Sequence, residues 1–180
     1  LEFEQLEDRQ AWTDVELAGG QVVRAPGVFA RATLTPAVLR MQAPTPGQHT
    51  GEVMNELQTA ARKPAPVPDA DGADAPFAGW EVLDLTWVSA GPASVRYFAD
   101  HGADVIKVEP VVGGDWARRL GVVYGDQTAY SIAGNLGKRS LALDLKSEDG
   151  KEILRQLADK ADVFMEGFRP GVAARLGFGY

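Results

Sequence analysis

The chain contains no cysteine and only two histidines among its 180 residues. The lack of cysteine excludes disulfides, thiolate nucleophiles and cysteine-based zinc sites within this sequence. His49 and His101 are far apart in the sequence, which argues against a histidine metal site. No apolar run approaches the ~20 residues that cross a membrane, and with no targeting segment visible a cytoplasmic location is the default expectation. The net charge of −7 argues against a nucleic-acid binder, which usually has a basic face.

What is present is the composition of a globular domain, with 45% hydrophobic and 24% charged residues. Residues 59–78 differ from the rest because they are rich in Ala, Pro and Asp, a composition that buries little and predicts a linker. This linker separates a first segment, residues 1–58, from a second segment, residues 79–180.

The second segment alternates predicted strands and helices. The apolar run Glu81–Thr86 predicts a strand, and Pro92 suits the first turn of a helix over residues 93–101 that Gly102 ends. Further strands are predicted at Val105–Val108, Ser140–Leu145 and Val163–Glu166. Further helices are predicted at 128–135, at 148–160 with Ser147 as its cap, and between Pro170 and Gly177. The alternation predicts an α/β fold with a doubly wound parallel sheet.

The first segment has the pattern of a domain's end. It predicts a polar helix at 2–12, a strand pair at Val15–Val23 around a Gly-Gly turn, and extended chain at Arg24–Phe29. A helix at 51–57 follows, with Thr50 as its expected N-cap. Because this ending precedes a beginning, we expect the chain to span the junction of two fused units.

Open parallel sheets bind ligands at the carboxyl ends of their strands. Three such ends are predicted, at Trp87–Gly91, Glu109–Gly114 and Gly167–Gly171. The turns before Pro92 and Val172 offer backbone N–H groups to a phosphate. Candidate cations for such a ligand are Lys138, Arg139, Lys146, Arg169 and Arg175. The sequence therefore predicts an α/β domain that binds a phosphate-bearing ligand.

Two alternatives for this ligand site fit the residues poorly. A dinucleotide site requires a glycine fingerprint, and Trp87–Ser94 contains only Gly91. A nucleophilic triad has no serine in an elbow motif, and His101 is expected at a helix end. Asp84 and Glu109 fall on strands, where we expect structural roles for paired carboxylates.

The second segment resembles the start of the class III CoA-transferases, the CaiB/BaiF family. The strings that carry the resemblance are GWEVLDLTWVSAGP (79–92), FADHGADVIKVEP (98–110), GGDWAR (113–118), NLGKRSLALDLKSEDGKEIL (135–154) and ADVFMEGFRPGVAARLGFGY (161–180). The first segment is similar to the carboxyl end of the same family in VVRAPGVF (22–29) and RMQAPTPGQHTGEVMNEL (40–57). The resemblance implies an upstream unit's end in 1–58 and the CoA-binding start of a second unit in 79–180.

The resemblance also implies a function. Members move coenzyme A between carboxylic acids, or in a racemase branch invert an α-methylacyl-CoA. It implies a Rossmann-like large domain, acyl-CoA and carboxylic acid substrates, and an interlaced homodimer or an intramolecular pseudo-dimer of tandem units. Reaction proceeds through an aspartate that forms anhydride and thioester adducts. That aspartate is expected beyond the segment matching Tyr180, so no residue of this chain is expected to be the nucleophile.

The resemblance implies CoA contacts at positions that match the family's motifs. They are Val88, Ser89, Ala90, Leu143, Asp144, Leu145, Lys146, Phe168, Arg169, Arg175 and Leu176. Three positions depart from common patterns. Ser89 stands where some formyl-CoA transferases have Gln, and Gly167 replaces a usual Asn. Pro110 replaces a phosphate-binding Arg of some members, and Arg118 is the expected substitute for that charge.

Three hypotheses remain from the sequence. The leading one is CoA transfer by a longer tandem protein, of which this chain supplies the CoA-binding part. The second is racemase-type epimerisation, which needs an acid/base pair beyond Tyr180. The third is a scaffold unit without catalysis. In each case we expect residues 1–58 to pack on residues 79–180, with residues 59–78 looping outside.

Overall fold

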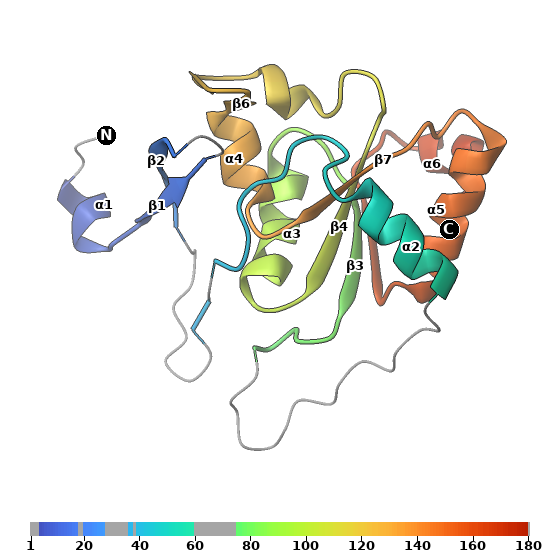
Figure 1. The fold of residues 1–180 in the computed structure, drawn as a ribbon, viewed down its shortest axis with the longest axis horizontal. Coiled ribbons are helices and arrows are strands. Elements are labelled where there is room, and N and C mark those ends of the chain that lie inside the picture. The colour runs from blue at the N-terminus through green and yellow to red at the C-terminus, as the bar shows by residue number, and fades with distance from the viewer. Residues whose placement is uncertain (1–3, 18–19, 28–35, 38, 60–74, 180) are drawn as a thin grey trace.

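The computed structural model describes residues 4–17, 20–27, 36–37, 39–59 and 75–179 (Figure 1). Its helices are α1 (Glu4–Asp8), α2 (Thr50–Thr59), α3 (Ala90–Asp100), a 3₁₀ turn η1 (Trp116–Arg119), α4 (Ala129–Asn135), α5 (Glu148–Lys160) and α6 (Val172–Leu176). Its strands are β1 (Trp12–Glu16), β2 (Val22–Pro26), β3 (Glu81–Leu85), β4 (Asp104–Glu109), β5 (Val123–Tyr124), β6 (Gln127–Thr128), β7 (Arg139–Ala142) and β8 (Val163–Glu166).

The centre of the fold is a four-stranded sheet in the order β7-β4-β3-β8. Every neighbouring pair in it is parallel, with Asp84 opposite Lys107 and Lys107 opposite Ser140. Parallel neighbours need crossover connections, which helices such as α3 between β3 and β4 supply. The predicted α/β fold with a parallel sheet is confirmed.

Side chains on a strand alternate between the faces of the sheet, and both faces are covered. One face packs on α3 through Val82, Val95, Val105 and their neighbours. The other packs on α5 and α2, where Leu83, Leu85, Ile106, Val108 and Leu141 meet Leu154, Leu157 and Val53. Figure 1 shows α3 on one side of the strands and α2 and α5 on the other, which is a doubly wound arrangement.

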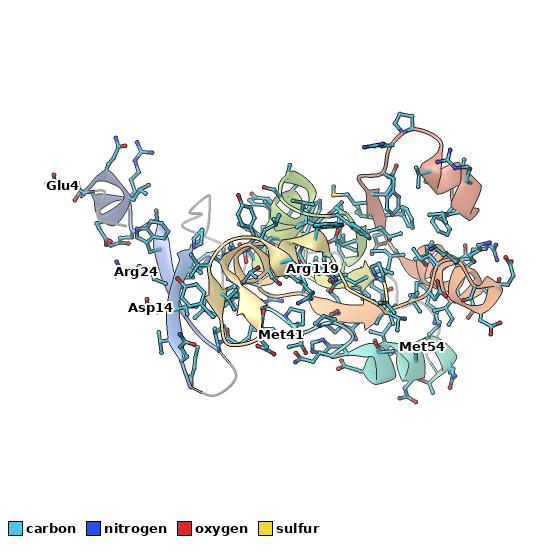
Figure 2. The ribbon with its side chains drawn as sticks, turned by 90° about the horizontal axis from the view of Figure 1, so that it is seen from above. Glu4, Asp14, Arg24, Met41, Met54 and Arg119 are labelled. Atoms are coloured by element: carbon cyan, nitrogen blue, oxygen red, sulfur yellow. The ribbon has the colours of Figure 1, made fainter. Side chains whose placement is uncertain are left out.

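The first segment packs on the second at two places. The antiparallel hairpin β1–β2 buries Val15 and Val23 against Ile132 and Leu136 of the α4 region. Figure 2 shows this hairpin, labelled at Asp14 and Arg24, at the opposite end of the molecule from Met54 of α2.

The second contact protects the free edge of β7. The Ser140 amide donates to His49 Nδ1 at 3.1 Å and the Ala142 amide donates to Thr50 Oγ1 at 3.1 Å. Arg139 binds Asp104 and also reaches Glu52 at 3.1 Å and Glu56 at 2.8 Å on α2. An edge strand left bare is a template for aggregation, and residues 49–56 cover it. These contacts confirm the expected packing of the first segment on the second.

Several local predictions need correction. Thr50 begins α2, and its hydroxyl accepts from β7 instead of capping the helix. Strand β7 ends at Ala142, three residues earlier than predicted, because the Asp144 turn begins there. The extended chain predicted from Arg24 belongs to β2 as far as Pro26, and residues 28–29 lie outside the described part.

The last residues of the predicted linker, from residue 75 on, are ordered against the second segment. Phe77 packs on Trp80 and Phe98, with ring centroids 5.4 and 4.8 Å away, and its amide donates to the His101 carbonyl at 3.0 Å. Thr59 closes α2, and residues 60–74 lie outside the described residues. In the described part of the chain, no helix is long and apolar enough to cross a membrane.

Candidate functional site

A cavity of about 580 Å³ opens at the carboxyl ends of the parallel strands. Strand ends and the loops that follow them supply its walls, as expected for an open parallel sheet. Its apolar lining is Leu85, Trp87, Val108, Pro110, Val111, Val112, Leu143, Leu145, Phe168 and Leu176, and its polar lining is Glu109, Asp144 and Lys146. A hollow of this size and character fits a small organic ligand.

The cavity gathers six of the eleven predicted ligand contacts. These six are Leu143, Asp144, Leu145, Lys146, Phe168 and Leu176. They come from two stretches of chain, after β7 and after β8, that are more than twenty residues apart in sequence. The structure does not place the other five in the cavity wall. Arg169 and Arg175 are exposed neighbours of Phe168 and Leu176, and Val88, Ser89 and Ala90 form the turn after Trp87.

The loop after β7 is held by its own hydrogen bonds. The Lys146 amide donates to Asp144 Oδ1 at 3.0 Å, and the Ser147 hydroxyl donates to the Asp144 carbonyl at 2.8 Å. The same hydroxyl caps α5 by accepting from the Gly150 amide at 3.0 Å. A Cβ at Gly150 would lie 2.1 Å from the Asp144 carbonyl oxygen, so the turn requires glycine there. Asp144 therefore shapes the loop that presents Leu145 and Lys146.

The loop after β8 brings Phe168 into the wall. Its amide donates to Glu166 Oε2 at 2.5 Å, and its ring packs against the apolar core. Gly171 then starts α6 in a left-handed conformation, with φ of 79°. This short turn places Leu176 on the same cavity, and it leaves Arg169 and Arg175 exposed to solvent.

The turn after β3 has an unusual backbone. Val88 has φ of 70°, a left-handed conformation that a β-branched residue rarely adopts and that costs about 1–3 kcal/mol. Next to it, a Cβ at Gly91 would lie 2.4 Å from the Thr86 Cβ, so the chain doubles back on β3 at a position that only glycine fits. A strained turn at the end of a central strand is characteristic of functional sites.

Next to this turn lies a network of six charged side chains, of which five are buried and Arg118 is partly buried. Lys138 Nζ binds Asp84 Oδ2 at 2.8 Å, Lys107 Nζ binds Asp115 Oδ2 at 3.1 Å, and Arg118 binds Glu109 at 2.6 Å. Three acids balance three bases, so the network carries no net charge. Asp84 and Glu109 have the structural roles that the sequence predicts.

Burial changes the proton affinity of these groups. Burial acts to raise the pKa of Asp84, but the charges of Lys138 and Lys107 outweigh it and hold that pKa below its usual value. Burial likewise opposes the ionised form of Glu109, and the hydrogen bond and charge of Arg118 nevertheless lower its pKa. Complete burial lowers the pKa of Lys138 to about 8 against the attraction of Asp84. Both carboxylates are therefore ionised at neutral pH.

Three of the predicted ligand cations are wrong because they belong to structural pairs. Lys138 is fully buried on Asp84 and the Pro92 carbonyl. Arg139 ties α2 to the sheet edge. Arg118, the expected substitute for a phosphate-binding Arg, binds Glu109 with two nitrogens and the Pro44 carbonyl with one. Sequence spacing does not indicate these partners, which lie up to 87 residues away.

A smaller hollow of about 150 Å³ adjoins the cavity and shares Trp87, Pro110 and Val112 with it. Arg119, labelled in Figure 2, lines it, with its Cζ 5.8 Å from the Trp116 ring centroid. Among the described residues, no cluster of His, Asp and Glu could hold a metal ion. The arrangement is thus suited to binding an extended ligand with apolar and anionic parts.

Comparison with known proteins identifies relatives of this site. The model of CoA-transferase family III matches residues 77–180, which include every wall of the cavity. An acetyl-CoA:oxalate CoA-transferase of Acetobacter aceti is 47% identical over 105 residues, covering 58% of this chain and 27% of that protein. A succinyl-CoA:glutarate CoA-transferase of Homo sapiens is 40% identical over 106 residues, covering 58% of this chain and 24% of that protein.

Solved structures agree with these sequence matches. A CAIB/BAIF family protein from Brucella suis superposes with a TM-score of 0.56 at 38% identity, over 59% of this chain and 29% of that one. The chain therefore spans about a quarter of the length of the curated relatives it matches.

Proposed function

Because the chain belongs to CoA-transferase family III, we propose that it forms the CoA-binding part of an enzyme that transfers coenzyme A between an acyl-CoA and a carboxylic acid. The observation that carries this proposal is the cavity at the strand ends, which gathers six residues predicted to contact CoA. The names of the relatives, which are oxalate and glutarate CoA-transferases, favour transfer over epimerisation.

Different residues of the cavity lining suit different parts of CoA. Leu143, Leu145, Phe168 and Leu176 offer apolar surface to the adenine and the pantetheine arm. Lys146 at the mouth, with the exposed Arg169 and Arg175 nearby in sequence, offers positive charge to the phosphates. The turn Val88–Ala90 would contact the end of the ligand that carries the acyl group.

The chemistry itself requires a nucleophile that these walls do not offer. The described residues around the cavity present two carboxylates, Glu109 and Asp144, and Arg118 neutralises the first while the second closes a turn. We propose that the catalytic aspartate belongs to sequence beyond Tyr180. We also propose that residues 1–58 end an upstream unit, that 59–78 link it to 79–180, and that the units work as a homodimer or a tandem pseudo-dimer. A cytoplasmic location remains a prediction of the sequence.

Calorimetric titration of the intact protein with CoA tests the binding proposal. The Lys146→Gln variant should bind CoA about three- to tenfold more weakly, because one charge-assisted phosphate contact is lost. Lys151→Gln is the matched control, since Lys151 lies outside the cavity lining and pairs with Glu148. Equal loss in both variants, or no CoA binding by the wild type at millimolar concentration, would contradict the proposal.

The transfer reaction has its own assay. Incubating the intact protein with an acyl-CoA and a labelled dicarboxylic acid should yield the labelled acid as its CoA thioester. Binding without exchange would support the scaffold hypothesis instead.

A further inference from the structure

The backbone on both sides of Trp87 is held by one buried ion pair. Lys107 Nζ donates to the Thr86 carbonyl, before Trp87, at 2.6 Å. Asp115 accepts from the Val88 amide, after Trp87, at 3.0 Å through Oδ1 and 3.2 Å through Oδ2. Both charged side chains have no exposed surface, and their ammonium and carboxylate groups are 3.1 Å apart. The pair therefore clamps a three-residue stretch from its two ends.

Asp115 also holds the loop that follows the neighbouring strand β4. Its own amide donates to Glu109 Oε1 at 3.0 Å, and its side chain caps η1 by accepting from the Ala117 amide at 3.0 Å. Glu109 and the following Pro110 line the same cavity as Trp87. One carboxylate thus sets the position of two loops that leave neighbouring strands.

The conformation of Val88 shows why a clamp is needed. A left-handed φ of 70° is unfavourable for valine, so the turn holds this shape only while other contacts impose it. The Asp115 carboxylate supplies those contacts at the Val88 amide itself. Trp87, which lines both the cavity and the smaller hollow, directly precedes Val88 in that turn.

We propose that Lys107 and Asp115 are positioning residues for substrate binding: the pair holds Val88 in its strained conformation and so keeps Trp87 and the Val88–Ala90 turn in place against CoA. This inference rests on the proposed function, because it explains how the turn that is proposed to contact CoA is held in place. Neither side chain lines the cavity, so the pair acts only through the turn.

The test uses Asp115→Asn, which keeps the size of the side chain but presents an N–H₂ group to Lys107. CoA affinity, measured calorimetrically on the intact protein, should fall about ten- to hundredfold, as misplacement of a binding wall by about 1 Å can cost. Val88→Gly alone is the reference variant: it removes the valine side chain from the turn, but glycine adopts positive φ without strain and so needs no clamp. The double variant Asp115→Asn/Val88→Gly should bind CoA within about threefold of Val88→Gly alone.

Rescue separates positioning from general stability. If Asp115→Asn lost affinity only because the fold weakened, it would lose the same factor in the Val88→Gly background, and that outcome would overturn the inference. Unchanged CoA affinity in Asp115→Asn would overturn it as well. If Asp115→Asn does not fold, the pair Lys107→Met/Asp115→Leu removes both buried charges together. This apolar pair should fold, bind CoA weakly and be rescued by Val88→Gly.

A second readout needs no CoA. Hydrogen exchange at the Val88 amide should be slow in the wild type and at least about tenfold faster in Asp115→Asn, because its acceptor is weakened. Slow exchange in both proteins would refute the clamp. A wild type that fails to bind CoA but shows the exchange difference would refute the proposed function and leave the clamp standing.

Discussion

The two faces of the central sheet use the same strands for different purposes. On the face toward α5, Leu83, Leu85, Ile106 and Val108 pack as an ordinary apolar core and continue into the cavity floor. On the face toward α3, the alternate positions Asp84, Lys107 and Glu109 carry charge and are fully buried. The comparison teaches that the first face is apolar at these positions, while the second adds to its apolar contacts with α3 a set of buried charges that holds the loops in place.

The largest effect is expected from breaking the charged face. Lys138→Met leaves Asp84 buried without its partner, which should lower the free energy of unfolding by about 3–5 kcal/mol. Urea unfolding measures the change. The control Asp84→Asn/Lys138→Met removes both charges and keeps an oxygen acceptor for the Thr86 hydroxyl, so it should regain most of the stability. Equal loss in the single and double variants would contradict a paired role.

The apolar face should respond to lost volume instead of lost charge. Leu154→Ala on α5 removes a fully buried side chain and should lower the free energy of unfolding by about 2–5 kcal/mol. Arg155→Ala on the same helix removes a half-exposed side chain and should change stability by less than about 0.5 kcal/mol. Denaturant midpoints of the two variants decide this, and similar values would argue against the assigned core.

Acid should weaken the charged face selectively. The pKa values of Asp84 and Glu109 are lower in the folded chain than in the unfolded one, so their contribution is complete above the unfolded values near pH 4. This contribution to stability is lost as the pH falls through the pKa values of the two carboxyls in the folded chain, since the unfolded state then binds more protons. Unfolding curves between pH 7 and pH 2.5 should show this decline. The free energy of unfolding of the Asp84→Asn/Lys138→Met variant should decline less steeply with falling pH. An identical decline in the variant and the wild type would contradict the role assigned to Asp84.

The smallest effect concerns the loop that joins the cavity to α5. Ser147→Ala removes the helix cap and should cost about 1 kcal/mol of stability. Ser94→Ala is the matched control, because its hydroxyl bonds the Ala90 carbonyl within α3 and its loss should cost less. Thermal unfolding measures both. A larger loss in Ser94→Ala would show that Ser147 does not act as a cap.

The difference between the faces also explains what the sequence could predict. The apolar run Glu81–Thr86 and the Ser147 cap are local signals, and β3 (Glu81–Leu85) and α5 formed there. The cavity followed from a general rule about strand ends together with a family resemblance. Lys107, Asp115 and Lys138 carry no local signal, because their roles depend on strand register and on loops that fold back from distant sequence.

The same reason explains the wrong ligand cations. Lys138 and Arg139 follow each other in the chain, yet one points to the buried Asp84 and the other to Asp104 and α2. Adjacent residues on a strand face opposite ways, and only the tertiary partner decides whether a lysine near a ligand loop is free. Lys146, which lies four residues beyond the end of β7, does line the cavity.

Hydrogen exchange with and without CoA tests the central claim most directly. On addition of CoA to the intact protein, peptides covering residues 143–147 and 167–177 should gain protection, because they form two walls of the cavity. Peptides covering the hairpin at residues 12–26 should exchange as before, since that hairpin lies at the far end of the molecule (Figure 2). Protection at the hairpin without protection at the two loops would contradict the account.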